Sequence, residues 1–478
     1  MSHWRRTRWT AFTTIGASGV NTQHLARDVS MTVIKRYFGL LSCTLIALYL
    51  FLSPTYALLN FRDYASELPH FMRYVLVPGL IGATFLALGL FSKPRFAAVA
   101  GINGLSVLLA LFAFEGLLTF RSIPVTLGIL GQFTDEQREN VVRGGAVIRG
   151  FALRELNRLS GTDKLSEALL SGFPATQVVL CASKDELITY TADRYGFNNP
   201  DQLYDRPLDL MLLGDSFVEG VCLPPGEDLA SRLRSGGLVA ASMGIRGNGP
   251  LIELATLGRF GRIFRPRHVV LVFFEGNDWE NLEAELSEPW LRAALAPGAD
   301  YGSQSTAQET LQRAGVMMRN KTQDRVTMAD LLTKTKVFRN FVALQQTFTR
   351  LGLIYPKIAH RSSMPKFRET LHRAKVLSAN WGGTLTIVYV PDIDRFMGAF
   401  SSDWAFDQLR TIVHDTAAAE GIEVIDLREA LRGVPAPERM YMPDRHFSRE
   451  GAAFAADVIF QRLKVIDQAS SGQAAPIR

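Results

Sequence analysis

Three long runs of apolar residues lie in the first quarter of the chain, at residues 37–59, 74–91 and 97–120. A helix needs about 20 mostly apolar residues to cross the hydrocarbon core of a bilayer. The pattern therefore predicts three transmembrane helices over residues 37–120. The preceding segment, residues 1–36, is polar and is expected to lie outside the membrane.

Basic residues beside the apolar runs predict how these helices are oriented. Lys35 and Arg36 precede the first run, and Lys93 and Arg95 lie between the second and the third. The link at residues 60–73 carries both signs of charge. Because Lys and Arg are enriched in cytoplasmic loops, the N-terminus and the Lys93–Arg95 turn are expected in the cytoplasm. An odd number of spans then places the rest of the chain on the other side.

Several alternatives for this region stay open. The first run could be a cleaved signal ending near Ala57, but its apolar core is long, which favours an uncleaved anchor. Translation could start at Met31 instead of Met1. Glu115 lies near the outer end of the third run, and an intramembrane carboxylate is often functional. Here its position favours helix packing or snorkelling.

After residue 206, short apolar runs alternate with helical patterns. The expected strands are 208–213, 238–241, 268–274, 384–390 and 422–425, and the clearest helices are 251–260, 367–379 and 407–420. This alternation predicts an α/β fold with a parallel sheet covered by helices on both faces. We expect this domain at 207–466, with a helical insertion at 282–364, a helical linker and lead-in at 121–206, and a disordered tail at 467–478.

Composition excludes some classes of function. The net charge of +6 in 478 residues is small, and no basic stripe is interleaved with aromatic residues, so no nucleic-acid partner is expected. The three cysteines form no CxxC pair, and we expect neither a metal nor a cofactor. Cys181 and Cys222 fall in the predicted oxidising compartment. A disulfide between them is favoured over two buried thiols.

Four pieces of a hydrolytic site follow one another at the ends of expected strands. Ser216, in Gly-Asp-Ser, comes directly after the strand 208–213. Such a turn exposes a hydroxyl at the carboxyl edge of a sheet, although Gly-Asp-Ser is also a common turn sequence. A glycine-rich turn at 244–249 comes next, where a backbone amide can approach a ligand. Asn277 then follows the strand 268–274, where its amide can stabilise an oxyanion.

The fourth piece is His446, just before the final helix, with Asp444 two residues earlier. In an extended segment, residues i and i+2 point to the same side. Asp444 could therefore orient the imidazole of His446 while that ring takes the proton of Ser216.

In this order the four pieces resemble the blocks of the SGNH/GDSL hydrolase family. The matching positions are Gly214-Asp215-Ser216 with Gly220, then Gly247 (Gly244 being the alternative), then Gly276-Asn277-Asp278, and last His446. The chain departs from the family pattern in one place, because Asp444 lies two residues before His446 instead of three. The resemblance spans about residues 208–463. Similar membrane-tethered bacterial proteins also carry the local pattern found here at residues 195–200, Tyr-Gly-Phe-Asn-Asn-Pro.

The resemblance implies a three-layer, flavodoxin-like SGNH fold. It implies that Ser216 is the nucleophile, His446 the base and Asp444 its orienting carboxylate, with Gly247 and Asn277 in the oxyanion hole. The expected protein is a multi-pass protein of the bacterial inner membrane whose periplasmic domain hydrolyses acyl or acetyl esters of envelope glycans or lipids. One alternative is an O-acyltransferase that receives acyl groups from a separate membrane carrier. The other is a non-catalytic glycan-binding protein.

Overall fold

The computed structural model describes residues 19–65, 67–129, 133–148, 151–182, 187–324, 327–334, 336–353, 363–400 and 403–470. The chain divides into two compact units, Met1–Phe114 and Glu115–Arg478. Each unit is described by itself below.

The first unit consists of long apolar helices. Its elements are α1 (Gly19–Leu59), α2 (Phe61–Tyr64), α3 (Leu68–Phe71), η1 (Met72–Leu76), α4 (Val77–Phe91) and the first part of α5 (Pro94–Ile129). Three segments are long and apolar enough to cross a membrane, at Tyr37–Leu59, Leu68–Phe91 and Pro94–Pro124. The prediction of three such helices is confirmed, but the second and third start earlier than expected. Pro69 and Pro94 explain this, because proline is favoured in the first turn of a helix.

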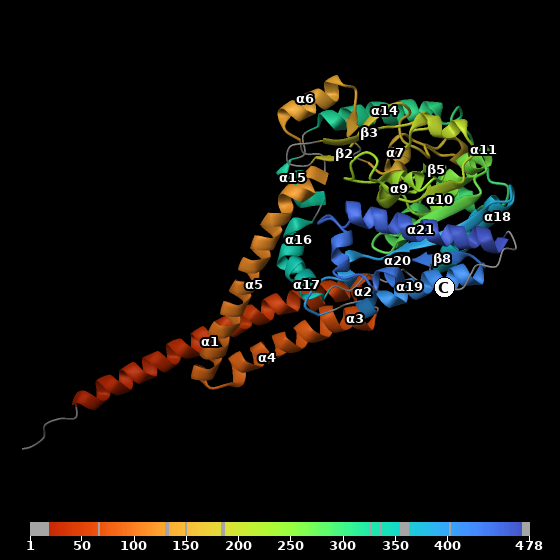
Figure 1. Ribbon diagram of the computed structural model, residues 1–478. Coiled ribbons are helices and arrows are strands. Elements are labelled where there is room, and N and C mark those ends of the chain that lie inside the picture. Colours follow the sequence, from red (N-terminus) through yellow and green to blue (C-terminus); the bar gives the residue numbers. More distant parts are fainter. Residues whose placement is uncertain are drawn as a thin grey trace, which may run out of the picture. The chain divides into compact units, whose positions relative to one another are not determined.

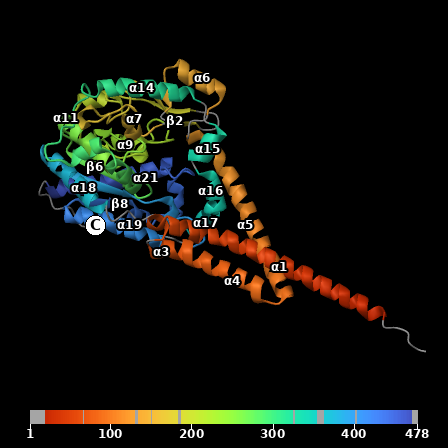
Figure 2. The ribbon, with the colours of Figure 1, turned by 180° about the vertical axis from the view of Figure 1, so that it is seen from behind.

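The second unit contains a five-stranded sheet enclosed by helices (Figures 1 and 2). Its strands are β4 (Leu210–Leu213), β5 (Ala240–Ser242), β6 (His268–Phe274), β7 (Thr384–Val390) and β8 (Glu423–Asp426). All neighbours pair in parallel, in the order β5-β4-β6-β7-β8. Numbered within this sheet the order is 2-1-3-4-5, in which ligands bind at the carboxyl ends of the strands near the reversal of strand order. The predicted parallel sheet is confirmed.

Helices cover both faces of this sheet. They are α8 (Ser216–Glu219), α9 (Leu229–Ser235), α10 (Pro250–Thr256), η4 (Leu257–Gly261), α11 (Arg262–Phe264), α18 (Met364–Ala379), η6 (Ile393–Arg395), α19 (Asp403–Ala419), α20 (Leu427–Leu431), η7 (Pro437–Met440) and α21 (Arg449–Ser470). Alternate residues of each strand enter two separate cores. Met211 and Leu213 pack with α10, η4, α18 and α19, whereas Leu210 and Leu212 pack with α8, α9, α20 and α21. The result is a three-layer α/β/α arrangement.

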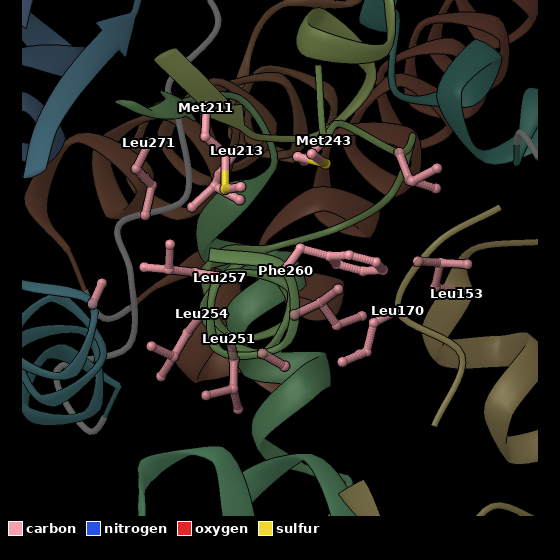
Figure 3. Packing of buried hydrophobic residues seen from close by; sticks show 14 of the residues in the cluster. Leu153, Leu170, Met211, Leu213, Met243, Leu251, Leu254, Leu257, Phe260 and Leu271 are labelled. Carbon is pink, nitrogen blue, oxygen red and sulfur yellow. The ribbon is translucent and has the colours of Figure 1, made fainter. Parts of the chain in front are cut away.

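Figure 3 shows the first of these cores, where Leu213 and Leu271 of the sheet face Leu257 and Phe260 of η4, the continuation of α10. All four side chains are fully buried. Burial of one such side chain contributes about 1.5–3 kcal/mol. This contact fixes α10, and with it the glycine-rich turn that precedes this helix.

The segment before the sheet corrects the expectation of a helical lead-in at 121–206. It contains α6 (Asp135–Arg143), β1 (Val147–Ile148), α7 (Leu153–Leu159), η2 (Leu165–Glu167), β2 (Gln177–Ala182), β3 (Leu187–Thr191) and η3 (Asp201–Asp205). The three strands form a second sheet, in which β2 pairs in parallel with β1 and antiparallel with β3. The prediction of helix was wrong here because Val178, Val179 and Leu180 form a short buried run, which suits a strand.

Helices fill the region between β6 and β7. They are α12 (Asp278–Leu286), α13 (Pro289–Arg292), η5 (Ala293–Leu295), α14 (Gln308–Gln323), α15 (Met328–Lys334), α16 (Val337–Val342) and α17 (Gln345–Leu351). Part of the insertion expected at 282–364 lies outside the described residues, and the expected domain boundaries stay a prediction.

The expected disorder of the tail from residue 467 is wrong for its first residues. Helix α21 continues to Ser470. The carboxylate of Asp467 lies 2.9 Å from His268 Nε2 and 3.2 Å from the Arg267 guanidinium, which holds this last turn on the domain. Residues 471–478 lie outside the described residues.

Candidate active site

Ser216 is the first residue of α8, at the carboxyl end of β4. Asp215 caps this short helix, because its carboxylate accepts a hydrogen bond from the Phe217 N–H at 3.0 Å. Gly220 ends the helix in the left-handed conformation, with φ +83°, which glycine adopts without strain. The turn therefore holds the Ser216 hydroxyl at the edge of the sheet where ligands bind in this class of fold.

The structure brings His446 and Asp444 to Ser216, although the histidine and the serine are 230 positions apart in sequence. The Nε2 atom of His446 lies 2.9 Å from Ser216 Oγ, and its Nδ1 atom lies 3.1 Å from Asp444 Oδ2. Because a carboxylate faces Nδ1, the hydrogen-bond pattern assigns the ring proton to Nδ1. The lone pair on Nε2 then faces the serine hydroxyl.

Arg445, which was not expected in the site, anchors the loop that carries His446. Its side chain contacts the carboxylates of Asp392, at 3.0 Å, and Asp394. Its own backbone has a φ of +78°, an uncommon conformation for a residue other than glycine. Asp392 and Asp394 directly follow β7, and polar residues after a buried strand were a sequence pattern that could have found them.

Asp215 joins the serine to Asn277. Its Oδ2 atom lies 3.2 Å from Ser216 Oγ and 3.3 Å from Asn277 Nδ2. Burial raises the pKa of Asp215, and these hydrogen bonds oppose that rise. The contact uses one amide hydrogen of Asn277, and its buried Oδ1 atom has no hydrogen-bond partner among the described residues. Gly276 is needed just before it, because a Cβ atom there would lie 2.4 Å from the Phe274 ring.

The two candidate glycines of the turn after β5 serve different purposes. A Cβ atom on Gly244 would lie 2.6 Å from the Glu219 backbone nitrogen, so this glycine lets the turn pack closely against α8. Gly247 has a φ of +77°. Within the part of the chain that the structure describes, neither the Gly247 N–H nor the Ser216 N–H has a hydrogen-bond acceptor. Neither amide is therefore engaged in a hydrogen bond within the described fold.

Two buried glutamates hold this turn, and sequence patterns did not single out either of them. Glu285 of α12 accepts hydrogen bonds from the backbone N–H groups of Gly249 (2.6 Å), Leu251 (2.9 Å) and Ile252 (3.3 Å). Burial raises the pKa of Glu285 to about 8, although these three hydrogen bonds oppose the rise. Glu219 accepts from the Arg246 N–H at 2.8 Å.

A third buried glutamate, Glu253, should make the stability of the folded chain depend on pH. Burial, followed by repulsion from Glu285 and Asp215, raises its pKa well above the usual range. The folded chain therefore keeps a proton that the unfolded chain loses near pH 4.3. The resulting stabilisation is complete below that pH and is lost as the pH rises through the folded-state pKa.

We expect Glu253→Gln to weaken this dependence, because glutamine resembles the protonated acid but cannot ionise. Thermal unfolding followed between about pH 5 and about pH 9 should show a smaller loss of stability for this variant than for the wild type. The exposed Glu309→Gln is the matched control and should follow the wild type. Parallel curves for Glu253→Gln and the wild type would contradict the assignment.

A disulfide joins Cys181 of β2 to Cys222, just after α8, with a Cα–Cα distance of 5.4 Å. It closes a loop with a sequence separation of 41 residues. Closing a loop of this length stabilises the fold by about 4 kcal/mol in the chain-entropy model. The bond therefore braces the segment that carries Ser216.

No group of three or more His, Cys, Asp or Glu side chains that could hold a metal ion occurs among the described residues.

Comparisons with known proteins add little to this geometry. No protein-family model matches the chain, and no curated protein matches it. Among solved structures, the chain is similar to a lipase/acylhydrolase from Enterococcus faecalis, with 17% sequence identity and a TM-score of 0.29. The match covers 56% of this chain and 98% of that one. A TM-score this low carries no inference about activity.

Proposed function

We propose that this protein is a membrane-anchored serine hydrolase of the SGNH type that cleaves acyl or acetyl esters. The observation that carries the proposal is the continuous hydrogen-bonded chain from Ser216 Oγ through His446 to Asp444. A serine hydroxyl facing the unprotonated nitrogen of an imidazole, whose other nitrogen faces a carboxylate, is an activated nucleophile. The blocks of sequence that resemble the SGNH/GDSL family meet at this one edge of the sheet.

The reaction proceeds in two steps. Ser216 Oγ attacks the ester carbonyl carbon while His446 Nε2 takes its proton. The carbonyl then re-forms, the ester C–O bond breaks, and the alcohol leaves with the proton from His446. In the second step water attacks the acyl-serine and gives a proton to His446, which returns it to Ser216 Oγ as the carboxylic acid departs. Asp444 keeps the ring in the tautomer that can accept a proton.

The oxyanion of each tetrahedral intermediate needs donors that are not already engaged. The N–H groups of Ser216 and Gly247 and the second amide hydrogen of Asn277 are the three donors proposed. Preorganised donors of this kind stabilise a developing charge without first having to give up another partner.

Asn277→Ala is expected to lower kcat for p-nitrophenyl acetate by about 10²–10³-fold, because one donor to the oxyanion is lost. KM should change far less, since the contact forms mainly in the transition state. Asn380→Ala, at the end of α18, is the matched control. An unchanged kcat for Asn277→Ala would remove this residue from the oxyanion hole.

We place the site on the extracytoplasmic side of a bacterial inner membrane. The basic residues beside the first and third spans support this orientation. The Cys181–Cys222 disulfide supports it independently, because such bonds persist outside the reducing cytosol. Esters of envelope glycans or lipids are the substrates available there.

A fluorophosphonate probe tests the proposal on the full-length protein. An activated serine forms a covalent phosphonyl adduct, and mass spectrometry of peptides should locate that adduct on Ser216. The rate of p-nitrophenyl acetate hydrolysis should fall in proportion to the fraction of Ser216 that is labelled. A protein that binds glycans without catalysis would not react. Transfer of acetyl groups to an added glycan in preference to water would instead identify an acyltransferase.

A further inference from the structure

Glu115 has a defined set of partners in the second unit. Its side chain is fully buried, and its carboxylate accepts hydrogen bonds from the backbone N–H of Gln346 (3.0 Å) and from the N–H (2.7 Å) and hydroxyl (2.8 Å) of Thr347. A Cβ atom on the next residue, Gly116, would lie 3.7 Å from the ring of Phe341. Helices α16 and α17 are therefore attached directly to α5 at Glu115.

The length of α5 predicts how deep this attachment lies in a membrane. From Pro94, where the third span begins, to Glu115 the helix advances about 32 Å at 1.5 Å per residue. The hydrocarbon core of a bilayer is about 30 Å thick. Measured along α5, Glu115 therefore lies about one hydrocarbon thickness from Pro94, within the apolar span that ends at Pro124.

The surface around α16 and α17 has the composition of a membrane interface. Phe338 of α16 is 74% exposed. Phe400 is 60% exposed and lies beside the end of α17, because its N–H donates to the Leu351 carbonyl at 2.8 Å. Residues 336–353 contain three basic residues and no acidic one. Exposed aromatic residues beside basic ones are typical of segments that lie in the headgroup region.

We infer that α16, α17 and the loop at Phe400 form a membrane-contacting surface, and that its partner is the headgroup layer of the bilayer that holds α5. We call these residues, 336–353 together with Phe400, the interfacial segment. The inference goes beyond the proposed hydrolysis and does not depend on it. It does depend on α5 crossing a membrane.

This surface also has a connection to the candidate active site. The loop that ends at Phe400 begins at η6, beside Asp392 and Asp394. These are the carboxylates that contact Arg445, the neighbour of His446. The interfacial segment is therefore linked to the loop of His446 through these two carboxylates.

The test places an environment-sensitive fluorophore on the full-length protein in nanodiscs of phosphatidylcholine and phosphatidylglycerol. Cys43→Ser supplies the background, because the remaining cysteines form the disulfide. An NBD group is attached to Phe338→Cys or, separately, to Phe400→Cys. The matched control is Val376→Cys on α18. Val376 is 42% exposed, and Arg368 of the same helix contacts Glu420, just after α19.

At positions 338 and 400, NBD emission should shift to the blue, and lipids with spin labels near the headgroup should quench it at least about threefold more than at position 376. Equal quenching at all three positions would overturn the inference. Size-exclusion elution and thermal unfolding show whether each variant is folded, and the two independent positions guard against a local defect. Because quenching does not depend on hydrolysis, Ser216→Ala should leave it unchanged. The outcome therefore tests membrane contact whether or not the protein is a hydrolase.

Discussion

Ser216→Ala and His446→Ala are each expected to lower kcat for p-nitrophenyl acetate by up to about 10⁶-fold, which leaves only the residual catalysis that the oxyanion hole and substrate binding supply. The serine supplies the atom that forms the acyl bond, and the histidine supplies the only imidazole nitrogen that lies 2.9 Å from it in the described structure. Because the two residues act as one unit, the double variant should be no slower than either single variant. Steady-state assays of the three proteins measure this directly.

Two matched controls separate loss of chemistry from loss of structure. Ser378 is a fully buried serine on α18 whose hydroxyl donates to the Ala374 carbonyl, so Ser378→Ala removes the same group from a distant position. His372 lies on the same helix and faces Glu420. Ser378→Ala and His372→Ala should both keep the wild-type kcat. Retention of more than about a tenth of the wild-type rate by Ser216→Ala would end the serine-hydrolase proposal.

The large sheet could be predicted closely from the sequence. The expected strands 268–274 and 384–390 coincide with β6 and β7, and the other three lie within a few residues of β4, β5 and β8. The physical reason is that parallel strands covered on both faces consist of nearly continuous apolar residues. The carboxyl ends of these strands then had to share one edge, which brought Ser216 and Asn277 together.

The supporting contacts of the site could not be predicted, because they join residues far apart in sequence. Nothing near Glu285 indicates that it binds the backbone of residues 249–252, and the contact of Arg445 with Asp392 spans 53 positions. The second sheet was missed for a similar reason. The apolar run in its strand β2 is too short to distinguish a strand from a buried helix segment, and pairing with β1 and β3 decides between them.

The proximity of Asp444 and His446 was predicted for a reason that the structure corrects. An extended segment was expected to point both side chains the same way. The structure instead has a tight turn, in which the Met442 N–H donates to the His446 carbonyl at 2.7 Å and Arg445 takes a positive φ. The turn brings the carboxylate to the ring, with Asp444 only two residues before His446. The contact of Arg445 with Asp392 anchors this turn on the loop after β7.

Asp444→Asn tests whether this tight turn orients the base, and we expect it to lower kcat by about 10⁴-fold. The amide of asparagine can donate a hydrogen bond to Nδ1, which moves the ring proton to Nε2 and leaves no acceptor for the Ser216 hydroxyl. Thermal unfolding should change little in comparison, because the two side chains have nearly the same shape. Steady-state kinetics together with fluorophosphonate labelling of Ser216 measures the effect, and both should fall together.

The chain contains a second Asp–His pair that serves as the control for this variant. Asp467 lies 2.9 Å from His268, a buried histidine at the opposite, amino end of β6. Asp467→Asn makes the same chemical change and should keep the wild-type kcat, because His268 lies at the edge of the sheet opposite Ser216, where its Nδ1 atom is 3.0 Å from the Thr384 hydroxyl. If Asp444→Asn also keeps the wild-type kcat and labelling, the carboxylate is not what selects the tautomer of His446. The ring would then owe its orientation to its packing against Phe217, whose centroid lies 5.4 Å away.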